Sequence, residues 1–190
     1  GGGIRGGEGG GGGATRQYAV VLFSDLVGFT ALTQRLDAVS VALVMHSLWS
    51  CFDALVQKHG LHKMDTVGDA FIVIGLVEPD SGDFQEELEA ATRSMLVLAR
   101  EMIVRLQDIC AGIGHEINIR IGMEVGPVMT GVIGKLQPRF HAHGVVMVLA
   151  QQLEAACPKG SINVSLDVAR LAGLPEAAAF EARAREEGGG

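Results

Sequence analysis

Two aspartates stand where a folded chain could bring their carboxylates together. Asp25 follows Tyr18–Ser24, an apolar run of strand length that is rich in β-forming residues. Asp69 lies in a tight turn after Thr66-Val67-Gly68, between two further strand-like runs. If these strands are neighbours in one sheet, the two carboxylates meet at its edge and can hold two divalent metal ions. Such a metal pair activates a hydroxyl and stabilises a leaving phosphate in an in-line displacement.

The segment after Asp25 suits a phosphate group. Leu26–Thr30 contains Gly28 and precedes a short helix predicted over 31–35, so backbone N–H groups at the helix start are free to bind phosphate oxygens. The alternative is structural, because aspartates at turns and helix starts more often serve as caps. On this pattern alone, metal binding and capping both stay open for Asp25 and Asp69.

The surrounding pattern predicts an α+β domain. Apolar residues at helical spacing predict helices over 39–59, 84–110, 145–156 and 166–171. Strands are predicted over 18–24, 61–66, 70–74, 116–124, 128–133 and 161–164, with a turn at Gly126-Pro127 joining 116–124 to 128–133. Because hairpins and helices mix in this order, a sheet with helices on one face fits better than an all-parallel sheet.

Length and composition fit one folded domain and disfavour polyanionic macromolecules as its main partners. The first 13 of the 190 residues are nearly all glycine, so 1–15 is expected to be a disordered linker or tag, 16–185 the domain and 186–190 a disordered tail.

The formal charge of −7 argues against nucleic acid or an anionic membrane as the main partner. We expect no transmembrane helix and no signal peptide, and three widely spaced cysteines indicate reduced thiols in a cytoplasmic protein.

Several segments resemble class III adenylyl and guanylyl cyclases. The two signature segments are FSDLVGFTALTQ at 23–34 and KMDTVGDAFIV at 63–73. Later segments of the family are resembled, in the right order, by Gly131–Gly134, Pro138-Arg139-Phe140, Gly144 and Ser161–Ser165. The resemblance covers nearly the whole predicted domain and favours metal binding over capping. It implies a ferredoxin-like, mostly antiparallel sheet with helices packed on it, working as a dimer with the active site in the groove between two domains.

One half of the family's site holds the metals, and the resemblance implies that this half is intact. Asp25 and Asp69 match the two metal-binding aspartates, and Leu26 matches a ligand that acts through its carbonyl. The phosphate loop is matched by Gly28, Phe29 and Thr30. The implied cofactors are two Mg²⁺ or Mn²⁺ ions, which activate the ribose 3′-hydroxyl for attack on the α-phosphate and release of pyrophosphate.

The other half, which binds the purine and stabilises the transition state, departs from the family pattern. Asp65 stands where guanylyl cyclases have glutamate and adenylyl cyclases lysine, and His141 stands where the family has Cys or Asp. Val148 and Gln152 replace an asparagine that orients the ribose and an arginine that neutralises the phosphate. Losing such a cation costs on the order of 10²–10³ in rate. In this the chain resembles the α-type subunits of soluble guanylyl cyclase, which also lack the pair.

The leading hypothesis is therefore the metal-holding half of a guanylate cyclase, converting GTP to cyclic GMP with a β-type partner chain. Asp65 favours guanine because a carboxylate accepts hydrogen bonds from guanine N1 and N2. The alternatives are a degenerate module for regulation or dimerisation, and a homodimeric adenylate or guanylate cyclase of low activity. His141 and His143 are interpreted as part of a strand facing the partner, since no third metal ligand follows at a useful spacing. No contact with nucleic acid or membrane is expected from this domain.

Overall fold

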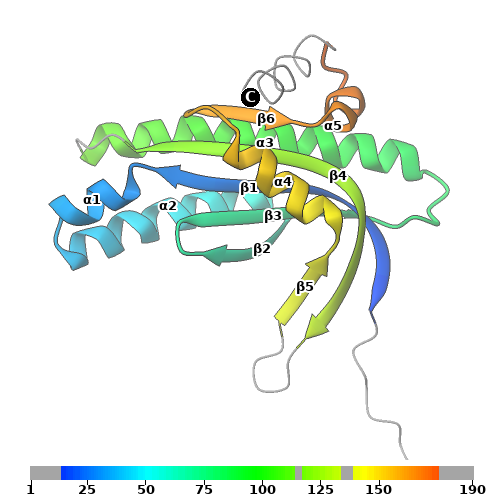
Figure 1. Cartoon of the computed structure of the whole chain (residues 1–190), viewed down its shortest axis with the longest axis horizontal. Helices are drawn as coiled ribbons and strands as arrows, with labels where there is room; N and C mark the ends of the chain where they lie inside the picture. The colour runs from blue at the N-terminus through cyan, green and yellow to red at the C-terminus, as the bar shows by residue number, and fades with distance from the viewer. Residues whose placement is uncertain (1–13, 114–116, 134–138, 176–190) are drawn as a thin grey trace, which may run out of the picture.

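A six-stranded sheet with helices on both faces forms the domain (Figure 1). The structure is a computed structural model of the chain, and it describes residues 14–113, 117–133 and 139–175. The predicted tail at 186–190 lies outside the described residues, as does the predicted linker at 1–15 apart from Ala14 and Thr15.

The sheet has the strand order β2-β3-β1-β4-β5, and β6 pairs with β4. The β4–β6 pair is parallel and the others are antiparallel, which confirms the predicted α+β class with a mostly antiparallel sheet. The elements in chain order are β1 (Thr15–Val27), α1 (Phe29–Arg35), α2 (Ala38–Lys58), β2 (His62–Val67), β3 (Ala70–Val77), α3 (Phe84–Ile113), β4 (Asn118–Ile133), β5 (Arg139–His143), α4 (Val145–Ala155), β6 (Ser161–Val164) and α5 (Leu166–Leu171).

Strand β4 differs from the prediction of two strands with a turn at Gly126-Pro127. It runs unbroken through both residues, which pair with Ala19 and Tyr18 of β1. On its other edge, β4 pairs with β6 over 120–123 and with β5 over 129–133. Pro127 falls in the gap between these two partners, where a missing N–H removes no ladder bond on that edge. The hairpin partner of the second half of β4 is β5, not its own first half.

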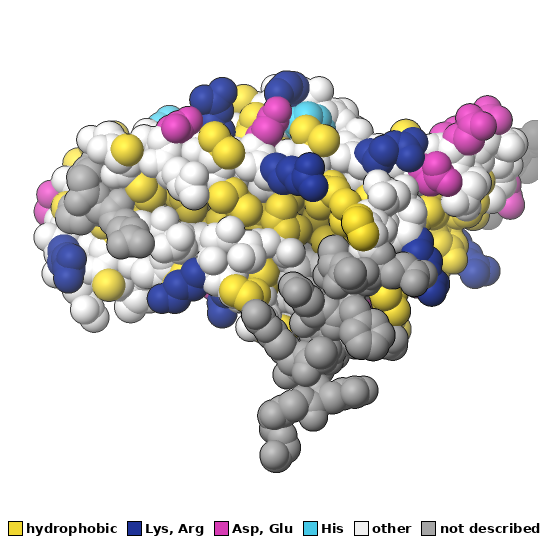
Figure 2. Space-filling model, turned by 90° about the horizontal axis from the view of Figure 1, so that it is seen from above, with side chains coloured by type: hydrophobic (Ala, Val, Ile, Leu, Met, Phe, Trp, Pro, Cys, Tyr) yellow, Lys and Arg dark blue, Asp and Glu magenta, His cyan; other side chains and the backbone are white. Residues whose placement is uncertain are grey.

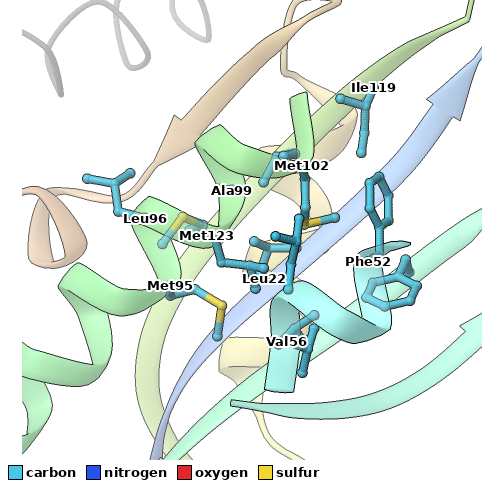
Figure 3. Packing of buried hydrophobic residues seen from close by; sticks show 14 of the residues in the cluster. Leu22, Phe52, Val56, Met95, Leu96, Ala99, Met102, Ile119 and Met123 are labelled. Atoms are coloured by element: carbon cyan, nitrogen blue, oxygen red, sulfur yellow. The ribbon is translucent and has the colours of Figure 1, made fainter. Parts of the chain in front are cut away.

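Helices α2, α3 and α5 cover one face of the sheet and enclose the larger core. Figure 3 shows Leu22 of β1, Phe52 of α2 and Met95 and Met102 of α3 within one cluster of side chains. All four side chains are fully buried. They are large and apolar, so each contributes about 1.5–3 kcal/mol of burial free energy, which fixes the helices on β1.

Helix α4 packs on the opposite face, so the prediction of helices on one face is wrong for this element. Ala19 and Val21 of β1 contact Val146 and Ala150 of α4 in a second, smaller core. Both faces of β1 are apolar because both are covered, which is why the strand reads as a continuous apolar run. The α4 backbone approaches β4 closely at Gly122, where an added Cβ would lie 2.1 Å from a backbone nitrogen of α4.

Helix α2 is long and apolar enough to cross a membrane by length and composition, with a mean hydropathy of 1.6. This differs from the expectation that no segment would meet that test. In the structure, Leu48, Phe52 and Val56 of α2 are buried against the sheet. Core helices often meet the same criterion.

Candidate active site

Asp25 and Asp69 lie beside each other at one end of the sheet. Asp25 is in register with Ala70, the residue that follows Asp69. The turn between β2 and β3 is made possible by Gly68, whose φ of 64° is left-handed and favours glycine. Burial is the main cause that raises the pKa of Asp25, the hydrogen bond from Arg120 lowers it, and the neighbouring Asp69 carboxylate raises it again. The predicted pair is thus brought together by the β1–β3 register.

A partly buried ion network faces Asp25 from β4 and α4. Nη2 of Arg120 donates a hydrogen bond to Oδ2 of Asp25 at 2.9 Å. Nε of Arg120 lies 2.9 Å from Oε1 of Glu154, an ion-pair distance without hydrogen-bond alignment. The Glu154 side chain is only 9% exposed, and burial is the main cause that raises its pKa. Arg120 is therefore shared between two carboxylates.

This donor set fits divalent metal ions. Asp25 and Asp69 offer the oxygen ligands that Mg²⁺ and Mn²⁺ prefer. Two ionised carboxylates in contact repel each other unless a cation lies between them. Beyond the Asp25–Ala70 pair, β1 continues to Val27 with β4 alone as its partner, so Leu26 borders an unpaired edge. Among the described residues no three His, Cys, Asp or Glu side chains already form a metal cluster, so further ligands would come from backbone, water or substrate.

The predicted phosphate loop forms the start of α1. Gly28 has a φ of 94° and caps the helix without a side-chain hydrogen bond. Its carbonyl accepts the Leu32 N–H, while N–H groups of the first helical turn, from Phe29 and Thr30, have no partner within a helix. The helix begins at Phe29, two residues before the predicted start. These N–H groups follow Asp25 and Leu26 closely along the chain, and their role in binding phosphate stays a prediction.

The two residues predicted to line a purine pocket, Asp65 and His141, occupy different faces in the structure. Asp65 lines an open pocket of about 500 Å³ together with Lys63, Met64, Thr66 and Phe140. The Asp65 carboxylate accepts the Thr66 N–H at 2.8 Å. His141 instead stacks on His143, with ring centroids 5.8 Å apart, because alternate residues of a strand share a face. Phe140, rather than His141, is the β5 residue beside Asp65.

Val148 and Gln152 lie one turn apart on the outward side of α4. Val148 is 54% exposed, and Gln152 is exposed as well. Glu154, two residues further on, is buried towards Arg120. One helix therefore presents the predicted transition-state positions outwards and a site carboxylate inwards.

Sequence analysis did not identify Arg120 and Glu154 as site residues. Arg120 appears in the sequence as the polar residue of an alternating strand, opposite Ile119 and Ile121. The contact with Glu154 depends on where α4 crosses β4, which no local pattern encodes. The available signal was a charged residue between two isoleucines of a predicted strand.

The surface seen from above carries mixed charge (Figure 2). Lys and Arg side chains are scattered among hydrophobic and uncharged ones, and acidic side chains gather at the end where α3 begins, which includes Glu86 and Glu87. The face shown in Figure 2 therefore has no continuous basic strip of the kind that binds a nucleic-acid backbone.

Sequence comparison places the chain among nucleotide cyclases. Residues 14–188 match the family model of the adenylate and guanylate cyclase catalytic domain. The guanylate cyclase soluble subunit alpha-1 of Canis lupus familiaris is 30% identical over 167 residues, which cover 88% of this chain and 23% of that protein. Guanylate cyclase 2G of Rattus norvegicus is 33% identical over 158 residues, which cover 81% of this chain and 14% of that protein. The chain spans less than a quarter of the length of these relatives.

Solved structures show the same fold. The guanylate cyclase domain of RhGC from Catenaria anguillulae, in complex with GTP, has a TM-score of 0.71 at 27% identity, covering 83% of this chain and 84% of that chain. The adenylyl cyclase CyaB from P. aeruginosa has a TM-score of 0.71 at 26% identity, covering 84% and 82%. With the family model matched over most of its length, the chain belongs to the adenylate and guanylate cyclase catalytic domain family.

Proposed function

We propose that this chain is the metal-holding half of a guanylate cyclase and converts GTP to cyclic GMP and pyrophosphate together with a second catalytic domain. The carrying observation is that Asp25 and Asp69 are in contact at an open end of the sheet, beside the Arg120 cation. Similar proteins include guanylate cyclases, and one solved relative holds GTP.

The residues of this chain have separate tasks in the proposed reaction. Asp25, Asp69 and the Leu26 carbonyl would hold two Mg²⁺ or Mn²⁺ ions, which when bound would supply Lewis-acid activation of the ribose 3′-hydroxyl and neutralise phosphate charge. N–H groups at the start of α1 bind and orient the phosphates. The guanidinium of Arg120, 2.9 Å from Asp25, lies where it can donate to phosphate oxygens bound there.

A partner is needed because α4 lacks the groups that stabilise a pentavalent phosphate. Valine at 148 offers no side-chain hydrogen bond, and glutamine at 152 carries no charge. A β-type chain with asparagine and arginine at these positions would supply both to the shared groove. Exposed apolar side chains on the α4 side of the molecule also favour a partner that covers them. Val132 and Phe140, which pair across β4 and β5, are 52% and 41% exposed, and Val145 is 72% exposed.

The test is cyclic nucleotide production with Mn²⁺ from GTP and from ATP. The chain is assayed alone and mixed with a β-type guanylyl cyclase domain that carries the asparagine–arginine pair. We expect no turnover from the chain alone and turnover of GTP in the mixture. Equal turnover without the partner would overturn the two-chain proposal and favour an active homodimer.

A second candidate is a module that kept the cyclase fold for regulation or dimerisation. The replacement of the transition-state pair by Val148 and Gln152 favours it, and the intact aspartate pair opposes it. Calorimetric titration with Mn²⁺ and GTP separates the enzyme from the regulatory module. A purely regulatory module of this kind would not bind metal–nucleotide, either alone or mixed with the β-type domain.

A further inference from the structure

We propose that Glu154 is a positioning residue that holds Arg120 by its Nε edge, so that the other guanidinium nitrogens stay in front of Asp25 for the triphosphate. The inference rests on the proposed function and adds a residue from outside the family motifs quoted above. It stands on three facts: the 2.9 Å contact of Glu154 with Arg120, the 2.9 Å contact of Arg120 with Asp25, and the burial of Glu154.

Glu154 sits on a backbone that has little freedom to move. Gly122 of β4 lets α4 approach so closely that a Cβ there would lie 2.1 Å from the Glu154 nitrogen. The next residues are tied down as well, since the Cys157 N–H donates to the Glu154 carbonyl and Asn163 Nδ2 donates to the Leu153 carbonyl at 2.9 Å. A carboxylate on a fixed helix end can define where a flexible arginine side chain lies.

Arg120 needs such a guide because its other carboxylate partner also binds cations in the proposed reaction. When Asp25 gives its oxygens to metal ions, the hydrogen bond from Nη2 of Arg120 is weakened. Among the described residues, Glu154 is then the carboxylate that still holds the guanidinium. Its pairing through Nε leaves the Nη groups free to donate to phosphate oxygens, which charge-assisted hydrogen bonds favour.

The direction in which nucleotide affinity changes when the Glu154 charge is removed separates a positioning role from a simple effect of charge. Removing a carboxylate makes the site less negative, so charge alone predicts tighter binding of an anionic nucleotide. Positioning predicts the opposite, because an unguided Arg120 pairs with Asp25 alone and turns away from the phosphates. Glu154→Gln keeps the size of the side chain and removes the charge, so it tests this difference directly.

Glu124→Gln is the matched control. Glu124 is another buried glutamate, on the same strand as Arg120. Its partners are the Ser165 hydroxyl at 2.6 Å and the Val125 N–H at 2.8 Å, and the structure gives it no cationic partner within the described residues. It therefore reports the effect of neutralising a buried carboxylate near α4 without a change at Arg120.

The experiment is calorimetric titration of the full chain, mixed with the β-type domain, with Mn²⁺ and 3′-deoxy-GTP, which cannot cyclise, and separately with GMP. We expect Glu154→Gln to weaken binding of the triphosphate about tenfold and to leave GMP binding unchanged. Glu124→Gln should change neither. Because Glu154 acts through Arg120, the double variant Arg120→Gln, Glu154→Gln should bind no more weakly than Arg120→Gln alone.

Unchanged or tighter triphosphate binding by Glu154→Gln would overturn the proposal, and so would additive losses in the double variant. If Glu154→Gln does not fold, Glu154→Asp keeps the charge and shortens the reach, and the same tenfold loss is expected from it. Failure of the proposed function gives a different result. Wild-type mixtures would then turn over no GTP, whereas failure of this inference alone leaves wild-type turnover intact and the variants equal to it.

Discussion

At the scale of single residues, Asp25 lies among groups that act on its charge in opposite directions. Burial and the Asp69 carboxylate disfavour its ionised form, while Arg120 favours it, and the outcome is a raised pKa. In the metal-free protein, ionising this side chain therefore opposes folding. A cation between Asp25 and Asp69 would instead favour the ionised form of Asp25, and this is the condition that the proposed chemistry needs.

The metal-free chain should lose stability as Asp25 and Glu154 ionise. Their pKa values are raised above the ordinary 3.8 and 4.5. Their contribution to the free energy of unfolding is therefore fully present below those values and is lost as the pH rises through the raised ones. Asp25→Asn cannot titrate, so its free energy of unfolding should fall less over the same range. Urea unfolding in EDTA between about pH 4 and about pH 8 measures this, and equal slopes for the two proteins would contradict it.

Asp69→Asn should separate catalysis from stability. The substitution keeps the side-chain size, removes a proposed metal ligand and relieves the repulsion that raises the pKa of Asp25. We expect turnover of GTP in the mixed dimer to fall by at least about 10²-fold, with the melting temperature of the metal-free chain unchanged or higher. Asp167→Asn, at a 68% exposed side chain of α5, is the control and should leave both unchanged. Full turnover by Asp69→Asn would refute its metal assignment.

The aspartates were predictable because each stands in a short local pattern of strand, turn and glycine. Arg120 and Glu154 were not, because their pairing depends on two elements meeting in three dimensions. His141 shows a further limit: its place in the sequence says nothing about which face of β5 it occupies, and the register with β4 decides that. Residues in a local sequence motif can therefore be predicted from the chain, whereas the side chains that contact them can be identified only from the fold.

At the scale of elements, the crossing of α4 over β4 connects the fold to the site. Gly122 is the contact point, two residues from Arg120, and α4 carries Glu154 on one side and the two transition-state positions on the other. The sequence predicted α4 as a helix within one residue at its end. It did not predict the face of the sheet that α4 covers, because an apolar strand buried on both faces has no alternation to indicate it.

Gly122→Ala should displace α4. A Cβ at this position would lie 2.1 Å from the Glu154 nitrogen and 2.3 Å from the Ala150 carbonyl oxygen, and backbone atoms cannot yield as a side chain does. We expect a loss of at least about 3 kcal/mol, or about 6–12 °C in melting temperature, together with loss of turnover in the mixture. Gly126→Ala, on the same strand, meets only the Val146 side chain at 3.4 Å and is the matched control. Equal melting temperatures for the two variants would contradict the close crossing.

Strand β4 shows how tertiary pairing overrides a local turn signal. Glycine followed by proline is typical of a turn, yet Gly126 and Pro127 lie inside a ladder with β1. The long β1 strand pairs with β4 from Thr15 to Val27, and this continuous ladder outweighs the preference of two residues. The result is a β4 that reaches from the site at Arg120 to the β5 hairpin at its far end.

At the scale of the whole molecule, the proposed function makes the chain one side of a groove. The acidic groups of the site lie at one end of β1, while exposed apolar residues of α4, β4 and β5 lie on the same side as the second core. A second cyclase domain covering that side would bury these residues and bring its own α4 towards Asp25. The activity of the chain without a β-type partner then depends on which side chains its α4 places in the groove of a second copy.

Restoring the lost pair should make the chain self-sufficient. In a homodimer of the variant Val148→Asn, Gln152→Arg, each groove receives the aspartates of one protomer and the asparagine and arginine of the other. Both positions are exposed on α4, so the substitutions disturb no core contact. We expect GTP turnover by the variant alone to exceed that of the wild-type chain alone by on the order of 10²–10³, the contribution of a charge aimed at the transition state.

Two further variants decide how this result is understood. Gln152→Arg alone should recover most of the gain, because the arginine meets the developing charge while the asparagine orients the ribose. Adding Asp69→Asn to the double variant should abolish the turnover again, because Asp69 would hold a metal ion that the proposed reaction needs whether or not the arginine is present. A double variant that melts like the wild-type chain and forms dimers, yet turns over no GTP, would mean that the second half is deficient beyond these two positions. Asp65, which stands where the resemblance implies glutamate in guanylyl cyclases, would be the next residue to exchange.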